Sequence, residues 1–317
     1  MKTTKPRIVS LGGGTGLSSL LRGLKKCDAD LSAIVTVTDD GGSSGRLREE
    51  LGVLPPGDIR NCMIALSEDE HLMSRLFRFR FNSDGSLHNH SFGNLFLTAM
   101  AGVTGDFAEA VHLTSEVLAI KGVIYPLTNS NVSLNAELED GSIVRGETRI
   151  TGSNQRIRRV YLNPADARAL PNALKAIGTA DVITIGPGSL YTSLIPNLLV
   201  REVVAAIHDS PATKIYIQNI MTQPGETVGY SAADHVKALS DHCDGLMFPN
   251  ILVNNREPSS SILKKYDAER AALVDIDKDR LRALQLNIVE RDLLAEDGVV
   301  RHDPDRLARA VFEMARL

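Results

Sequence analysis

Tryptophan is absent from the chain, and aromatic residues make up only 4% of its 317 residues. Cysteine is also scarce, because Cys27, Cys62 and Cys243 are odd in number and widely separated. This spacing excludes a disulfide framework and any Cys-x-x-Cys metal or redox motif, and it is typical of a reducing cytosol. The shortage of aromatic rings argues against a surface that stacks nucleic-acid bases.

Basic charge is not in excess either. The net charge is −4 and the isoelectric point is near 6.1, which argues against the broad positive field that holds DNA or RNA. Long apolar runs are missing, since the run at 8–11 is too brief for a membrane span or a signal-peptide core. We therefore expect a cytoplasmic protein with no membrane span and no nucleic-acid partner.

The alternation of apolar, β-branched runs with segments of helical periodicity predicts an α/β fold. We expect a Rossmann-like, mainly parallel sheet flanked by helices, in a single domain over residues 1–317. A helical insertion is predicted at about 58–121, and a small antiparallel β-hairpin insertion at about 123–162, where 132–138 and 142–148 flank a turn at 139–141. The strands predicted for the main sheet are 7–11, 33–37, 182–185, 214–218 and 251–253.

Four polar residues are placed to begin helices, where a side-chain oxygen accepts an otherwise unpaired backbone N–H. They are Asp58, Ser91, Asp106 and Asp303, and the last stands directly before Pro304, which suits the first position of a helix.

A glycine-rich loop, Gly12-Gly13-Gly14-Thr15-Gly16, follows the first predicted strand and opens a helix near Leu17. Such a loop can bring backbone N–H groups and a helix N-terminus against phosphate oxygens. It lacks the Gly-Lys-Ser/Thr ending of a P-loop, and the third glycine of a G-x-G-x-x-G fingerprint would fall on Ser19. The loop is thus either a phosphate site or a tight structural turn.

Two acids follow the second strand in the run from Thr38 through Asp39 and Asp40 to Arg46. Asp39 and Asp40 could hold Mg²⁺ that bridges phosphates, or accept hydrogen bonds from ribose or sugar hydroxyls. Ser43 and Ser44 lie in the flexible loop that follows, and Arg46 could counter a pyrophosphate. The alternative is a solvated turn with ordinary helix capping.

Further polar residues stand at loops expected to line the same crevice. His88 and His90 form a His-x-His pair, but no third metal ligand is near in sequence, so hydrogen bonding to a sugar or base is favoured. Because two glycine turns in one parallel sheet indicate a ligand across the strand ends, the residues alone predict a binder of a phosphorylated small molecule. The candidates in these loops are Asp58, Asn61, His90, Ser91, Asn94, Gly186, Gly188, Ser189, Tyr191, Asn219, Thr222 and Asn254.

Taken together, these motifs resemble the YvcK-type gluconeogenesis factors, which are related to the CofD-like 2-phospho-L-lactate transferases. The resemblance implies a bacterial cytoplasmic protein that binds UDP-sugars such as UDP-N-acetylglucosamine. It also implies a regulatory role in cell shape and peptidoglycan precursor supply on gluconeogenic carbon sources, with an amino-sugar biosynthesis enzyme as a partner. The matching stretches are 12–17, 38–50, 55–61, 90–96, 186–198, 221–234, 252–255 and 301–304.

The same resemblance is also compatible with a transferase function. In the transferases the corresponding glycine loop and acid pair lie near donor phosphates and metal, which makes Asp39 and Asp40 the candidate catalytic residues and Mg²⁺ the candidate cofactor. In the C-terminal part, Tyr266 could stack on uracil or simply pack its helix, and Arg301 could pair with the pyrophosphate. A nicotinamide-dependent oxidoreductase is disfavoured by the incomplete fingerprint, and a homodimer is a further expectation.

Overall fold

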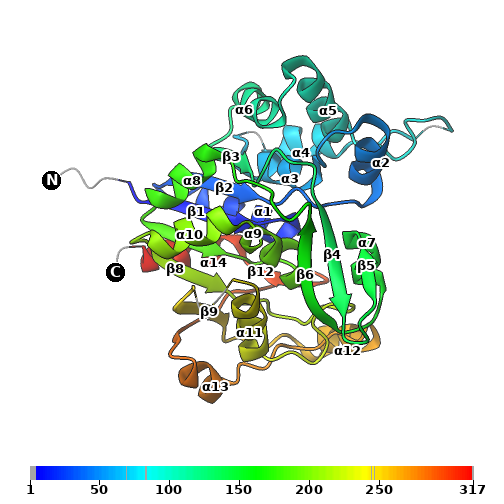
Figure 1. Ribbon diagram of the computed structural model, residues 1–317. Coiled ribbons are helices and arrows are strands. Elements are labelled where there is room, and N and C mark those ends of the chain that lie inside the picture. The colour runs from blue at the N-terminus through cyan, green and yellow to red at the C-terminus, as the bar shows by residue number, and fades with distance from the viewer. Residues whose placement is uncertain (1–4, 69, 83, 244, 246, 316–317) are drawn as a thin grey trace.

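A seven-stranded parallel sheet forms the centre of the molecule (Figure 1). The computed structural model describes residues 5–68, 70–82, 84–243, 245 and 247–315. Every neighbouring pair of strands is parallel, so the predicted fold class is confirmed. In spatial order the strands are β10 (Asn287–Arg291), β9 (Asn250–Asn254), β8 (Thr213–Ile217), β7 (Val182–Ile185), β1 (Arg7–Gly12), β2 (Asp30–Val35) and β3 (Val123–Pro126).

The strand order reverses between β1 and β7. From β1 the sheet continues through β2 and β3 on one side, and from β7 it continues through β8, β9 and β10 on the other. In open α/β sheets, ligands bind in the crevice where the loops at such a reversal diverge. The loops after β1 and β7 are the two glycine turns of the sequence.

Helices cover both faces of the sheet, which is why its central strands are apolar on both sides. All four residues of β7 are buried, and α1 (Gly14–Leu24) buries a leucine face formed by Leu17, Leu20, Leu21 and Leu24. The other helices outside the two insertions are α8 (Pro171–Gly178), the π-helix η1 (Leu190–Leu194), α9 (Ile195–Leu198), α10 (Arg201–Asp209), α11 (Ala232–His242), α12 (Ser260–Ala268), α13 (Lys278–Ala283) and α14 (Pro304–Met314).

The predicted helical insertion contains α3 (Gly57–Leu66), α4 (Glu70–Arg78), α5 (Phe92–Thr104) and α6 (Phe107–Val117), and a further helix, α2 (Gly42–Leu51), precedes its predicted start. Ser91, Asp106 and Asp303 cap α5, α6 and α14 as predicted. The assignment of Asp58 as a cap is wrong, because α3 already begins at Gly57 and Asp58 lies in its first turn. Its carboxyl group instead accepts a hydrogen bond from the backbone of Gly14.

The antiparallel insertion is a three-stranded sheet rather than a hairpin. It contains β4 (Ser133–Leu138), β5 (Ile143–Arg145) and β6 (Ile157–Asn163), with α7 (Glu147–Gly152) between the last two. Two predicted boundaries are wrong: 123–126 is β3 of the main sheet, and 147–148 begin α7, because Gly146 ends the strand with a φ of +90°. Short β10 and the hairpin of β11 (Leu294–Glu296) and β12 (Val300–His302) were not predicted, since neither contains a long apolar run.

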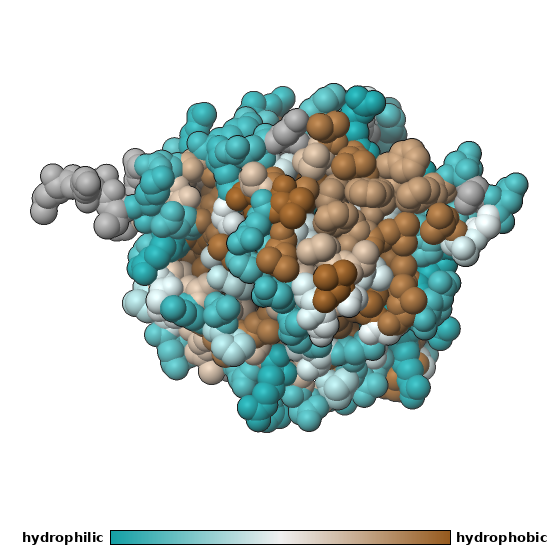
Figure 2. Space-filling view, turned by 90° about the horizontal axis from the view of Figure 1, so that it is seen from above, coloured by the Kyte–Doolittle hydropathy of each residue, from teal (hydrophilic) through white to brown (hydrophobic). Residues whose placement is uncertain are grey.

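Apolar side chains gather on the surface of the helical insertion, as the brown area in Figure 2 shows. Large exposed side chains of this insertion are Leu72, Leu76, Phe79, Leu87 and Val103. Continuous apolar surfaces often mark protein contacts, but the homodimer expected from the sequence stays a prediction. Among the described residues, no single helix is long and apolar enough to cross a membrane, and only one bent pair of helices, 190–198 with 201–209, passes that test when taken together.

The packing of α1 against α14 predicts that Gly23→Ala destabilises the fold. A Cβ at Gly23 would lie against the carbonyl oxygen of Pro304, far inside contact distance. We expect a loss of about 1–3 kcal/mol in unfolding free energy, the usual cost of overpacking, measured by urea denaturation. The control is Gly102→Ala in α5, where a Cβ meets nothing within 4 Å and the helix should gain about 0.5–1 kcal/mol. Equal stability of the two variants would contradict this prediction.

Candidate functional site

A cavity of about 690 Å³ opens at the strand reversal, within the range of small-molecule sites. Its walls come from the loops after β1, β2, β7 and β8, together with α1, α3, α7, α12 and β12. Of the residues predicted from the sequence, those that line it are Gly13, Gly14, Thr15, Gly16, Asp39, Asp58, Gly188, Ser189, Asn219, Thr222, Tyr266 and Arg301.

The two glycine turns touch each other in the wall of this cavity. A Cβ at Gly16 would run into the carbonyl group of Pro187, and one at Gly13 would come within 2.6 Å of the Asp58 carboxylate. A side chain at Gly16 would therefore force the two turns apart, and one at Gly13 would displace Asp58. The close approach leaves the N-terminus of α1, which begins at Gly14, facing the cavity. A helix N-terminus carries partial positive charge and unpaired N–H groups, so it favours an anion.

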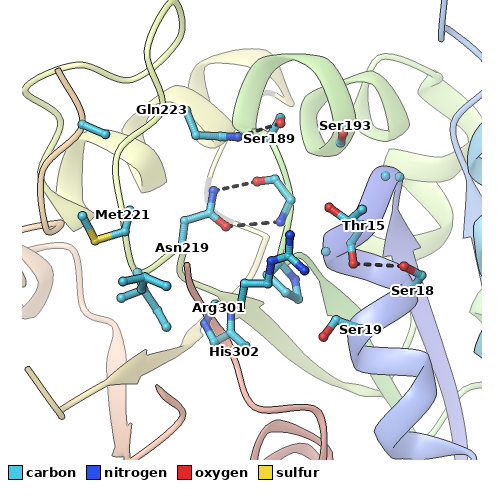
Figure 3. A pocket seen from close by; sticks show the side chains of 18 of the residues that line it. Thr15, Ser18, Ser19, Ser189, Ser193, Asn219, Met221, Gln223, Arg301 and His302 are labelled. Carbon is cyan, nitrogen blue, oxygen red and sulfur yellow. Dashed lines mark hydrogen bonds between the residues drawn. The ribbon is translucent and has the colours of Figure 1, made fainter. Parts of the chain in front are cut away.

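Side chains from the β8 loop hold the second glycine turn in place (Figure 3). Asn219 donates through Nδ2 to the carbonyl oxygen of Gly188 at 2.7 Å and accepts from its N–H at 3.2 Å. Gln223 donates to the hydroxyl of Ser189 at 2.9 Å. Asn219 was predicted to contact ligand, and the structure shows that both polar ends of its amide already bind Gly188.

Positive and aromatic groups come from the C-terminal part of the chain. Arg301 of β12 reaches into the cavity between Asn219 and the α1 residues Thr15 and Ser19 (Figure 3). Tyr266 packs against a small apolar cluster that includes Met221, and its hydroxyl accepts the N–H of Val300 at 2.9 Å. Helix packing by Tyr266 is thus shown, and stacking of its cavity-lining ring on a base stays a prediction.

Three carboxyl groups, those of Asp39, Asp58 and Glu147, gather where α3 and α7 meet the glycine loop. Surrounding protein atoms raise the pKa of Asp58 to about 7, with the charge of Asp39 as the next cause and the Gly14 N–H opposing it. Burial, then the charge of Asp39, raises the pKa of Glu147 to about 9. Both side chains are partly open to the cavity, so a ligand that donates hydrogen bonds or a cation would relieve the repulsion.

Two carboxylates of the cavity, those of Asp39 and Asp58, could serve as metal ligands. Asp39 accepts the Gly41 N–H at 2.9 Å with one oxygen, and its other oxygen lies against Gly57, the residue before Asp58. Within the described part of the chain, no group of three or more His, Cys, Asp or Glu side chains could hold a metal ion, and this includes the His88 and His90 pair. Any Mg²⁺ between Asp39 and Asp58 would therefore need phosphate oxygens of the ligand to complete its shell.

Several predicted residues form a polar network and do not line the cavity. The network centres on the guanidinium of Arg60, which donates to Ser91 at 2.7 Å, to Asn94 at 2.8 Å and to Asn61 at 3.0 Å. His90 pairs with Ser43 at 3.0 Å, and Asn94 donates to Ser44 at 3.3 Å.

The other predicted residues outside the cavity have local partners. Thr38 pairs with Thr36, Arg46 donates to the His88 carbonyl, and Tyr191 pairs with Tyr230. Asp40 binds Thr148 through two hydrogen bonds. Gly12 and Gly186 lie in the two turns without lining the cavity, and Asn254 lines a neighbouring cavity of about 200 Å³. Their roles as ligand contacts stay predictions.

Sequence reasoning missed part of the lining. Ser18, Ser19 and Arg22 lie four to eight residues after Gly14 on α1, so a polar stripe at helical spacing was the signal that could have found them. Glu147 gave no local signal, whereas Gln223 and His302 lie in the matching stretches 221–234 and 301–304 without having been chosen as candidates. His302 is buried, which lowers the pKa of its ring to about 4, so the ring is neutral at physiological pH.

The Asp58 environment predicts a pH-dependent stability. A carboxyl group whose pKa is raised in the folded chain favours folding while protonated, and that contribution is lost as pH rises from 3.8 through about 7. We expect the unfolding free energy to fall between pH 5 and pH 8, and to fall less in Asp58→Asn, which cannot ionise. Chemical denaturation across this range measures the difference. Parallel pH profiles for the two proteins would contradict the assignment.

Comparison with known proteins identifies clear relatives. Residues 8–294 match the family described as 2-phospho-L-lactate transferase CofD. The chain is 49% identical over 313 residues to the gluconeogenesis factor of Bacillus subtilis, covering 98% of this chain and 99% of that protein. It is 45% identical over 314 residues to the gluconeogenesis factor of Listeria monocytogenes, covering 99% and 97%. A crystal structure of a Bacillus halodurans protein matches with a TM-score of 0.94 and 47% identity, covering 98% of this chain and 99% of that one.

Proposed function

The chain belongs to the CofD family and is similar along its length to bacterial gluconeogenesis factors, and on this premise we propose that it is a UDP-sugar-binding regulatory protein. Its ligand is a nucleotide sugar such as UDP-N-acetylglucosamine, bound in the cytoplasm. The ligand state governs an enzyme of amino-sugar synthesis, and through it cell shape and the supply of peptidoglycan precursors on gluconeogenic carbon sources.

The observation that carries this proposal is the mixed chemistry of one cavity. The α1 N-terminus and Arg301 offer positive charge to a diphosphate. Tyr266 offers a ring face for a base, and the carboxyl groups on the α3 and α7 side offer acceptors for sugar hydroxyls. A nucleotide sugar carries these three chemical parts in one molecule of suitable size.

A regulatory role follows from how many separate elements the cavity joins. Its walls come from loops far apart in sequence, after β1, β7 and β8, and from β12. A ligand that contacts them together stabilises one arrangement of these loops and thereby changes the surface offered to a partner.

The second candidate function is a Mg²⁺-dependent transferase, favoured by the carboxylates of Asp39 and Asp58 beside the glycine loop. When bound, Mg²⁺ would supply charge stabilisation to a phosphoryl-type transfer, chemistry that needs mainly positioned charge. The chain's own residues would hold the ion through Asp39 and Asp58 and orient the donor phosphates on the α1 N-terminus.

Calorimetric titration with UDP-N-acetylglucosamine, UDP-glucose, GDP and NAD, with and without Mg²⁺, separates these functions. Saturable binding of a UDP-sugar that mass spectrometry finds unchanged supports the regulatory protein. Formation of a new product supports the transferase. Binding of GDP or NAD alone overturns the UDP-sugar proposal.

Arg301→Ala should weaken UDP-N-acetylglucosamine binding by about 10- to 100-fold, the usual cost of losing a charge-assisted hydrogen bond. Calorimetry on the purified variant measures this loss. Arg282→Ala is the matched control, since Arg282 is exposed on α13 and pairs with Asp279 away from the cavity. If both variants bind as the unchanged protein does, Arg301 makes no contact with the ligand.

A further inference from the structure

Among the described residues that line the cavity, only Glu147 comes from the antiparallel insertion. It is the first residue of α7, so the main sheet does not position it directly. Its side chain is half-buried in the cavity wall, on the same side as Asp39 and Asp58. The contacts that hold α7 therefore decide whether Glu147 reaches the ligand.

Asp40, the second acid after β2, fastens the start of α7. One oxygen of its carboxylate accepts both the N–H of Thr148, at 2.9 Å, and the hydroxyl of Thr148, at 2.7 Å. The other oxygen occupies the space that a Cβ at Gly146 would need, and the positive φ of Gly146 also favours glycine there. Asp40 thus binds the residue after Glu147 and lies close to the residue before it.

The C-terminal end of α7 is also held in place, by packing against other segments. Gly225 approaches the carbonyl group of Thr151 so closely that a Cβ at Gly225 would overlap it. Ile150 of the same helix is fully buried in the main core. The loop that contains Gly225 also supplies Thr222 and Gln223 to the cavity, so α7 and this loop form one continuous wall.

We infer that Glu147 determines specificity for the sugar part of the ligand, and that Asp40 and Thr148 are positioning residues that hold it in the wall. The inference rests on the UDP-sugar binding proposed above. Three carboxyl groups on one side of the cavity disfavour a diphosphate there, whereas sugar hydroxyl and acetamide groups can exchange hydrogen bonds with them.

The surroundings of Glu147 support this assignment. Burial and the neighbouring acids raise the pKa of its carboxyl group, so the group can donate one hydrogen bond and accept another, as a glutamine side chain does. The acids that act on it are Asp39, Asp58, Glu226 and Asp40. The other charged or titratable residues of the cavity are Arg22, Arg78, Tyr266, Glu269, Arg301 and His302.

Comparing the dissociation constants of UDP-N-acetylglucosamine and of UDP tests the inference, because UDP lacks the sugar. Glu147→Ala should raise the dissociation constant of UDP-N-acetylglucosamine by about tenfold and leave the dissociation constant of UDP unchanged. Glu147→Gln should bind the sugar nucleotide nearly as well as the unchanged protein. Thr148→Val removes the hydrogen bond from the Thr148 hydroxyl to Asp40. It should also raise the dissociation constant of UDP-N-acetylglucosamine, but by less than Glu147→Ala does.

Glu139→Ala is the matched control, since this exposed acid lies in the turn of the same insertion and pairs with Arg156. It should change neither constant. If Glu147→Ala fails to fold, Glu147→Asp takes its place, with the same expected loss of preference for the sugar nucleotide. Unchanged binding of both ligands, or an equal loss for both, overturns the inference. An unchanged protein that binds neither ligand overturns the proposed function itself.

Discussion

The parallel pairing of β1 with β7 is the contact on which the candidate site depends. Residues 8–11 of β1 lie in register with 182–185 of β7, so the glycine turn after each strand leaves the sheet at the same edge. Because Gly16 has no side chain, its backbone can approach the carbonyl group of Pro187. This contact closes the floor of the cavity and turns the N-terminus of α1 toward it. The loops on either side of the reversal then diverge and leave the crevice open.

The chemistry of the cavity follows from which elements this arrangement brings to its edge. The helical insertion contributes Asp58, and the antiparallel insertion contributes Glu147, so acids collect on the side of α3 and α7. The C-terminal hairpin contributes Arg301 on β12. Burial raises the pKa values of the Asp58 and Glu147 carboxyl groups, and the charge of Asp39 raises them further. A ligand with hydroxyl groups at one end and phosphates at the other suits this distribution.

Asp39 and Asp40 illustrate how neighbouring residues with the same chemistry acquire different roles. The sequence presents them as one acid pair after a strand, and either could be expected to hold metal or ligand. In the folded chain Asp39 lines the cavity, whereas Asp40 accepts two hydrogen bonds from Thr148. The difference arises from a segment more than 100 residues away, so no local pattern could have separated the two.

The sequence by itself determined the central strands of the main sheet, the caps at Ser91, Asp106 and Asp303, and both glycine turns. These features depend on periodic burial, on backbone conformation and on side chains within three residues, and all of these are determined by residues close together in the sequence. Only the tertiary structure decided that β3 joins the main sheet, that Arg60 binds Asn61, Ser91 and Asn94, and that Glu147 lines the cavity. Such contacts depend on the order and packing of distant segments, which local composition does not encode.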